Sequence, residues 1–107
     1  MRGDPGGTSL TTLLITHDAC LNHLTPQGHP ERPDRLRAVD RALEAEEFHA
    51  LLRELAPMAR IEAALLAHDL EYVQMIAESA PEEGMVSIDG DTTMSPGSLE
   101  ATLRGVG

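Results

Sequence analysis

The sequence predicts an α/β fold, and three observations support that prediction. The stretch Leu10–Thr16 is apolar and β-branched, which is typical of a buried strand. Several later segments repeat apolar residues at helical spacing, so helices are expected to follow the strand. A run of polar residues comes directly after the strand, where open α/β sheets place their functional loops.

The length of 107 residues fits one small domain with a modest core, and no internal repeat or domain boundary is visible. Residues 1–9 are rich in Gly and Pro, which predicts a disordered tail. The last stretch, Ser98–Gly107, predicts the opening turns of a helix, although Gly105 and Gly107 offer a possible C-cap. We therefore expect residues 10–107 to be the N-terminal part of a single larger domain, truncated at the C-terminus.

The charge pattern narrows the class of partner. The net charge is −10, and all eight basic residues are Arg. Phosphate recognition needs concentrated Lys and Arg, so direct nucleic-acid binding is not expected. An acidic surface suits a cationic substrate such as a polyamine or a basic tail, although acidic balance also simply favours solubility.

The cysteine content and the apolar runs indicate a compartment. Cys20 is the single cysteine, so an internal disulfide is excluded and a reducing compartment fits. No apolar run approaches the length of a membrane span. The run Leu10–Ile15 is too short and too rich in threonine for a signal-peptide core, and Arg2 is a thin basic flank. We expect a cytoplasmic location and no membrane partner.

The segment Gly28–Val39, with the sequence GHPERPDRLRAV, combines a rigid turn with the start of a helix. Pro30 and Pro33 fix their own φ angles and push the residues before them out of helical space. Glu31 and Arg32 are enclosed between these prolines, which predicts a buried arginine. A turn this rigid is unusual for a simple connector.

Helical spacing organises the middle of the chain. Asp34 stands at the expected N-cap of an amphipathic helix that runs to about Ala45. Phe48–Leu55 is expected to continue that helix or to start a second one, and Pro57 ends the region. Met58–Ile61 is compatible with a short strand.

Two further helical pieces are expected at Glu62–Ala67 and at Asp69–Ala80, with Asp69 as the N-cap between them. Pro81 and Gly84 then break the chain. A loop with the sequence SIDGDTTMSPGS leads from this break into the final helix.

Three histidines, His17, His23 and His29, fall six residues apart, with Asp18 and Glu31 close by. Imidazole and carboxylate groups suit zinc or iron. A six-residue spacing, however, matches neither a helix face nor a compact zinc loop. Hydrogen-bonded loop histidines are therefore favoured over metal ligands.

The loop at residues 87–98, called the second loop below, resembles a calcium site in its spacing of oxygen-bearing side chains. Positions one, three, five, seven and twelve of an EF-hand loop are matched by Asp89, Asp91, Thr93, Ser95 and Glu100. The sixth position, which needs Gly for a sharp turn, is Met94, and the eighth is Pro96. This departure disfavours calcium binding.

Two motifs resemble the zinc-dependent deacetylase family of histone deacetylases, acetylpolyamine amidohydrolases and acetoin-utilisation proteins. His29–Leu36 resembles the His-Pro-Glu-Arg-Pro-x-Arg-Leu stretch of class II and bacterial members, and Asp91–Ser98 resembles their Asp-Thr-x-x-Ser-Pro-Gly-Ser stretch. The motifs stand in the family's order, and the resemblance covers nearly everything from Leu13 onward. It implies the N-terminal portion of an arginase/deacetylase-type fold, an open, mostly parallel sheet flanked by helices.

The resemblance also implies roles for three residues. The acidic residue of the family's second loop lies at the rim of the substrate tunnel and accepts hydrogen bonds from the substrate. That substrate-binding role falls on Asp91, with Thr93 near the tunnel wall. Arg32 matches an arginine beside an internal channel for the acetate product, where a guanidinium can grip a carboxylate. The alternative for Arg32 is that it pins the loop by donating to backbone carbonyls.

The resemblance implies a zinc cofactor in the full-length enzyme, held by ligands outside this chain. The family's zinc is bound by two aspartates and a histidine, a His-His pair transfers protons and a tyrosine polarises the acetyl carbonyl. This sequence has no adjacent histidines and no Asp-x-His. We therefore expect no catalytic residue and no metal ligand among these residues, which alone should be inactive.

The implied function is that of the N-terminal part of a deacetylase that hydrolyses acetyl-lysine or acetylpolyamine amides. The expected partners are an acetylated lysine peptide or an acetylated polyamine, together with the remainder of the same domain. The alternative is a complete small acidic module that mediates interactions or responds to calcium.

Overall fold

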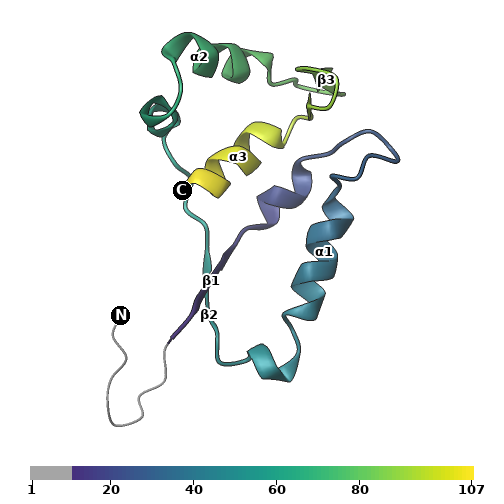
Figure 1. Cartoon of the computed structure of the whole chain (residues 1–107), viewed down its shortest axis with the longest axis vertical. Coiled ribbons are helices and arrows are strands. Elements are labelled where there is room, and N and C mark those ends of the chain that lie inside the picture. Colours follow the sequence, from purple (N-terminus) through teal and green to yellow (C-terminus); the bar gives the residue numbers. More distant parts are fainter. Residues whose placement is uncertain (1–10) are drawn as a thin grey trace.

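The structure is a computed structural model that describes residues 11–107. Strands and helices are interspersed along the chain, with the last two strands adjacent in sequence (Figure 1). The α-helices are α1 Pro33–Ala42, α2 Leu70–Ser79 and α3 Ser98–Val106. The strands are β1 Leu13–Thr16, β2 Leu52–Leu55, β3 Val86–Ser87 and β4 Thr93–Met94. Short 3₁₀ helices are formed by Asp18–Asn22, Glu46–Phe48 and Ile61–Leu66.

β1 and β2 form a small parallel sheet. Their register pairs Leu13 with Leu52 and Thr16 with Leu55. α1 lies on the connection between the two strands, as a parallel crossover requires (Figure 1). The predicted strand Leu10–Thr16 is confirmed over Leu13–Thr16, which form β1, whereas residues 11 and 12 precede the strand.

The prediction of a helix over Phe48–Leu55 was wrong. Glu46–Phe48 forms a single 3₁₀ turn, and the last four residues of the segment are strand β2. Pairing with β1 overrides the local preference of the sequence Leu-Arg-Glu-Leu, which has no β-branched residue. The strand expected at Met58–Ile61 is also absent from residues 11–107, where Ala59 instead donates its N–H to the carbonyl of Leu103 in α3.

α1 begins two residues earlier than the expected N-cap at Asp34 implies. Pro33 is its first residue, Arg32 is the extended residue before it, and Asp34 lies in the first turn rather than at the N-cap. Proline is favoured at this position because its missing N–H would be unpaired in any first turn and its φ is already helical. The Asp34 carboxylate instead accepts a hydrogen bond of 2.7 Å from Arg37.

The second half of the chain follows the predicted helices more closely. Asp69 is the N-cap residue of α2, although its side chain makes no cap hydrogen bond. α3 confirms the helix expected from Ser98 onward. The loop between them contains an antiparallel hairpin that was not predicted, with Val86 opposite Met94 in β3 and β4.

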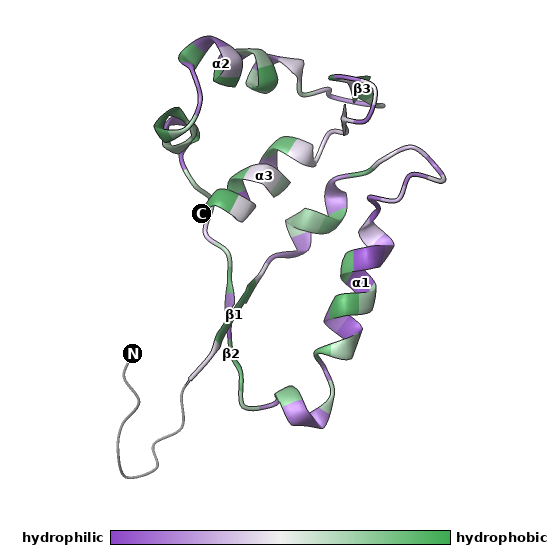
Figure 2. Ribbon diagram, in the orientation of Figure 1, coloured by the Kyte–Doolittle hydropathy of each residue, from purple (hydrophilic) through white to green (hydrophobic). Residues whose placement is uncertain are grey.

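The core of residues 11–107 is small. Its buried apolar side chains are Ala19, Ala56, Val73 and Met94. Parallel sheets normally have both faces covered, yet Ile15 is 52% exposed and Leu55 71% exposed. Figure 2 shows hydrophobic colour on both strands. The tail expected at residues 1–9 lies outside the described residues.

Candidate functional site

Two loops, one after β1 and one before α3, are joined through Ser95, whose side chain is fully buried. Its Oγ accepts the N–H of Leu24 at 2.8 Å and donates to the carbonyl of Asn22 at 2.9 Å. A hydroxyl can do both at once because it has one hydrogen and two lone pairs. Ser95 therefore holds the chain on either side of His23 against the second loop.

Ser98 continues this network one helical turn further. Its Oγ accepts the N–H of Ser95 at 2.8 Å and lies 2.6 Å from Nδ1 of His23. Because Ser98 is 3% exposed, its hydroxyl is a structural link and not an accessible nucleophile. The network closes the carboxyl side of β1 onto the N-terminus of α3.

Gly97 allows the backbones to come this close. A Cβ at this position would lie 2.4 Å from Cβ and 2.7 Å from the carbonyl oxygen of Asn22. Any larger residue would collide with the end of the first 3₁₀ helix, which α3 packs against (Figure 1). The glycine of the SPGS sequence is therefore required by packing.

His29 connects the proline-bounded turn to the second loop. Gly28 has a φ of +85°, a left-handed conformation that favours glycine, and the N–H of His29 donates to the carbonyl of Pro26. The imidazole Nδ1 accepts the N–H of Glu31 at 3.0 Å. The other ring nitrogen, Nε2, lies 3.2 Å from the carbonyl oxygen of Asp91.

Asp91 has a fixed backbone and a free carboxylate. Its N–H donates to Oδ1 of Asp89 at 2.8 Å. Within residues 11–107, no hydrogen bond or ion pair occupies either carboxylate oxygen of Asp91, and the residue is exposed. The pKa of Asp89 is lowered because the backbone N–H of Asp91 and the side chain of Thr92 donate to its charged form. A turn stabilised in this way presents one acceptor group to the outside.

Thr93 and Arg32 are the other two predicted site residues. Thr93 is half-buried in β4, opposite Ser87. Arg32 is exposed, which corrects the expectation of a buried arginine: the prolines make its backbone extended but do not enclose its side chain. Among the described residues no backbone carbonyl accepts from its guanidinium. Arg32 lies three residues after His29, so it belongs to the same turn.

The three evenly spaced histidines do not converge in the structure. His17 accepts the N–H of Ala19, while His23 and His29 bond to different parts of the second loop. Residues 11–107 contain no cluster of three or more His, Cys, Asp or Glu side chains that could hold a metal ion. Each of the three histidines instead makes hydrogen bonds within or between the loops.

The residues of the calcium-like spacing have separate partners in the structure. Ser95 is buried against Asn22, the Asp89 carboxylate accepts from its own turn, and Glu100 on α3 pairs with Arg104 at 3.3 Å. These contacts build a hairpin and a helix start rather than an ion-binding loop.

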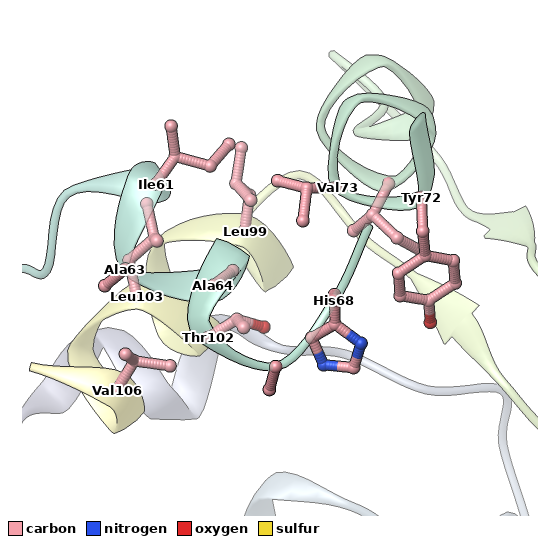
Figure 3. Close-up of a pocket in the computed structure, with 12 residues that line it drawn as sticks. Ile61, Ala63, Ala64, His68, Tyr72, Val73, Leu99, Thr102, Leu103 and Val106 are labelled. Carbon is pink, nitrogen blue, oxygen red and sulfur yellow. The ribbon is translucent and has the colours of Figure 1, made fainter. Parts of the chain in front are cut away.

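An apolar hollow of about 360 Å³ lies elsewhere in the molecule, between α2, α3 and the 3₁₀ helix Ile61–Leu66 (Figure 3). Val73, Leu99 and Leu103 line it, and the rings of His68 and Tyr72 lie 5.2 Å apart at its side. None of its lining residues belongs to the turn at 28–32 or to residues 89–98. The hollow is therefore separate from the candidate site.

Sequence patterns alone did not reveal the contacts of His23 and His29 with the second loop. The available signal was the run of polar residues after β1, since side chains at the carboxyl ends of parallel strands meet at one edge of the sheet.

No helix within the described range is long and apolar enough to cross a bilayer.

Comparisons with known proteins support a fold assignment. No family model and no curated protein matches the sequence, whereas six chains of solved structures match. One is the crystal structure of the HDA15 HD domain, with 23% sequence identity and a TM-score of 0.78. The match covers 92% of this chain and 30% of that chain, so this chain spans less than a third of the length of the HDA15 chain.

This likeness shows the fold. The small parallel sheet with its flanking helices matches part of the HDA15 HD domain, which confirms the α/β class and the parallel sheet flanked by helices expected from the sequence.

Proposed function

We propose that this chain forms the N-terminal part of a zinc-dependent deacetylase domain that hydrolyses acetyl-lysine or acetylpolyamine amides. The observation that carries the proposal is the structural likeness to the HDA15 HD domain over 92% of the chain. Both loops whose sequences resemble the family lie in this region, and they are in contact through His29 and Asp91.

Asp91 is proposed to bind the substrate at the rim of the site. Its carboxylate is exposed and has no partner within residues 11–107, whereas both peptide groups around it are held. A carboxylate in this state can accept two amide hydrogens from a peptide or a protonated amine. Thr93 in β4, two residues after Asp91, is proposed to line the wall of the substrate tunnel.

Arg32 is proposed to face the path of the acetate product. Its guanidinium is exposed and donates to no carbonyl of the described residues, which argues against the alternative of a loop pin. An unpaired guanidinium can bind a carboxylate through two parallel hydrogen bonds.

The zinc of the proposed enzyme is proposed to be bound by residues outside this chain. The described range offers no group of three or more suitable side chains, so it does not fit a complete zinc site. The metal ligands and the groups that transfer protons are proposed to lie in another part of the domain. The residues described here would orient the substrate and product only.

The remainder of the same domain is the proposed partner of the sheet. Ile15 and Leu55 are apolar strand residues that remain exposed, and the β1–β2 sheet has two open edges. Further strands and helices would cover these surfaces.

We also propose a cytoplasmic location, on the basis of the single cysteine.

The test is hydrolysis of an acetylated lysine peptide and of an acetylated polyamine by the complete natural protein loaded with zinc. Asp91→Ala should lower kcat/KM by about ten- to a hundredfold, the loss expected for one charge-assisted hydrogen bond. Zinc content and the melting midpoint should stay near wild type. Asp40→Ala, which removes an exposed carboxylate from α1, is the matched control and should keep full activity.

Two outcomes are informative against the proposal. Absence of hydrolysis of either substrate by the wild-type protein would overturn the deacetylase function. Full activity of Asp91→Ala would overturn only the role of Asp91.

A further inference from the structure

We propose that His29 is a positioning residue that fixes the direction of the Asp91 carboxylate. This inference rests on the proposed function, because it concerns how the same rim residue meets its substrate. It begins with the two ring nitrogens of His29, each of which has a different partner.

The partners decide where the ring hydrogen lies. Nδ1 faces the backbone N–H of Glu31 at 3.0 Å, and since an N–H can only donate, Nδ1 must be the unprotonated nitrogen. Nε2 faces the carbonyl oxygen of Asp91 at 3.2 Å, and since a carbonyl can only accept, Nε2 must carry the hydrogen. The neutral Nε2–H form of the imidazole satisfies both bonds at once.

Two hydrogen bonds hold the backbone of Asp91, and neither involves its side chain. The carbonyl of Asp91 is held by His29, and its N–H is held by Asp89 at 2.8 Å. With the peptide groups before and after it both anchored, Asp91 cannot rotate its backbone without breaking one of them. A carboxylate that must orient a substrate gains from such anchoring, because small misplacements lower the rate strongly.

The anchor also ties Asp91 to the rigid turn. Gly28 adopts its left-handed conformation directly before His29, and Pro30 follows directly after it. The imidazole therefore projects from a backbone with little freedom. The geometry points to a connection in which the first family-like motif supports the substrate contact of the second.

Two substitutions separate the two bonds. In His29→Asn the side-chain oxygen can still accept the N–H two residues on, as Asp89 does for Asp91, but the shorter side chain cannot reach the carbonyl of Asp91. In His29→Gln the longer amide can still donate to that carbonyl, but it loses the bond to Glu31. Each variant is thus the control of the other.

The experiment measures kcat/KM of the complete natural protein on an acetylated lysine peptide. His29→Asn should lower kcat/KM about tenfold, mainly by raising KM. His29→Gln should keep most of the wild-type kcat/KM. In an Asp91→Ala background, His29→Asn should have no further effect, because His29 acts through Asp91. An undiminished tenfold loss in that background, or equal losses in Asn and Gln, would overturn the positioning role.

Amide hydrogen exchange at residues 91–93 makes this test independent of the proposed function. Exchange should be faster in His29→Asn than in wild type and near wild type in His29→Gln. Unchanged exchange in His29→Asn would overturn the inference even in an active enzyme. A wild-type protein that hydrolyses neither substrate but shows this exchange pattern would overturn the proposed function and leave the connection between His29 and Asp91 established.

Discussion

At the residue scale, short polar side chains hold the candidate site together. Ser95 and Ser98 are buried, yet both have their hydrogen bonds satisfied by one another and by the chain around His23. No buried side-chain polar atom among the described residues lacks a partner. Such satisfied networks specify one arrangement of the loops, because each displaced partner would leave a buried polar group unpaired.

Asp89 predicts a dependence of the turn on pH. Its pKa is lowered by hydrogen-bond donors from Asp91 and Thr92, so the folded turn stabilises the carboxylate more than the carboxylic acid. A lowered pKa gives stability that is present above the unfolded value of about 4 and is lost as the pH falls through the folded value. Amide exchange at residues 89–92 should therefore be constant near neutral pH and should accelerate, relative to the intrinsic rate, below about pH 4.

Asp89→Asn is the control for this pH dependence, because it keeps an acceptor oxygen but cannot titrate. A protection that falls with the same pH profile in this variant would show that another group is responsible.

Arg32 allows a second test at this scale. Arg32→Lys keeps the charge and removes the planar guanidinium. Because Arg32 is exposed and pins no described carbonyl, we expect an unchanged melting midpoint, slower turnover and an altered response to added acetate in the complete enzyme. A lowered midpoint together with a wild-type acetate response would favour the loop-pin alternative.

At the element scale, α3 organises the carboxyl ends of both parallel strands. Its first residue, Ser98, and Ser95 in the loop before it bind the chain after β1, and the C-terminal half of α3 binds the chain after β2. There, Leu103 accepts the N–H of Ala59, and Arg104 donates to the carbonyl of Ala56 at 3.1 Å. α3 thus places the second loop at the sheet edge where α/β folds carry their sites.

Two glycines of this region should respond in opposite ways to substitution by alanine. Gly97→Ala would place its Cβ 2.4 Å from Cβ of Asn22, so we expect a loss of about 1–3 kcal/mol in the free energy of unfolding. Gly105→Ala lies in α3 with open space around it, so we expect a gain of about 0.5–1 kcal/mol. Urea unfolding of the complete protein measures both, and a neutral Gly97→Ala would contradict the close approach.

At the scale of the whole molecule, residues 11–107 expose much of their apolar surface. The radius of gyration is 17.3 Å, compared with about 13 Å for a typical 100-residue domain. The large exposed side chains include Leu52, at 55%, and Leu66, at 93%. A two-stranded sheet is rarely stable by itself in water. These features fit one part of a larger domain.

We therefore expect residues 1–107, expressed alone, to melt without cooperativity and to bind a dye that reports exposed apolar surface. Calcium should not change the melt, since Ser95 and Glu100 are bonded within the fold. The complete natural protein, as the control, should melt cooperatively. A sharp transition of residues 1–107 with a midpoint raised by calcium would favour the alternative of a small calcium-responsive module.

The sequence by itself determined the elements whose patterns are local. The apolar run of β1, the periodicity of α2 and α3, and the proline at the start of α1 each act on their own backbone, so the pattern predicts the element. It also identified the two motifs and the polar side chains near them. Arg32 was misjudged because its burial depends on what packs over the turn and not on the turn itself.

Only the tertiary structure decided the contacts between distant segments. Leu52–Leu55 is a strand because β1 supplies its hydrogen-bond partners 39 residues earlier in the chain. The bond between His29 and Asp91 joins residues 62 positions apart, and the one between His23 and Ser98 joins residues 75 positions apart. No local pattern encodes such pairs, because hydrogen bonding depends on distance in space, and that distance is set only when the whole chain has packed.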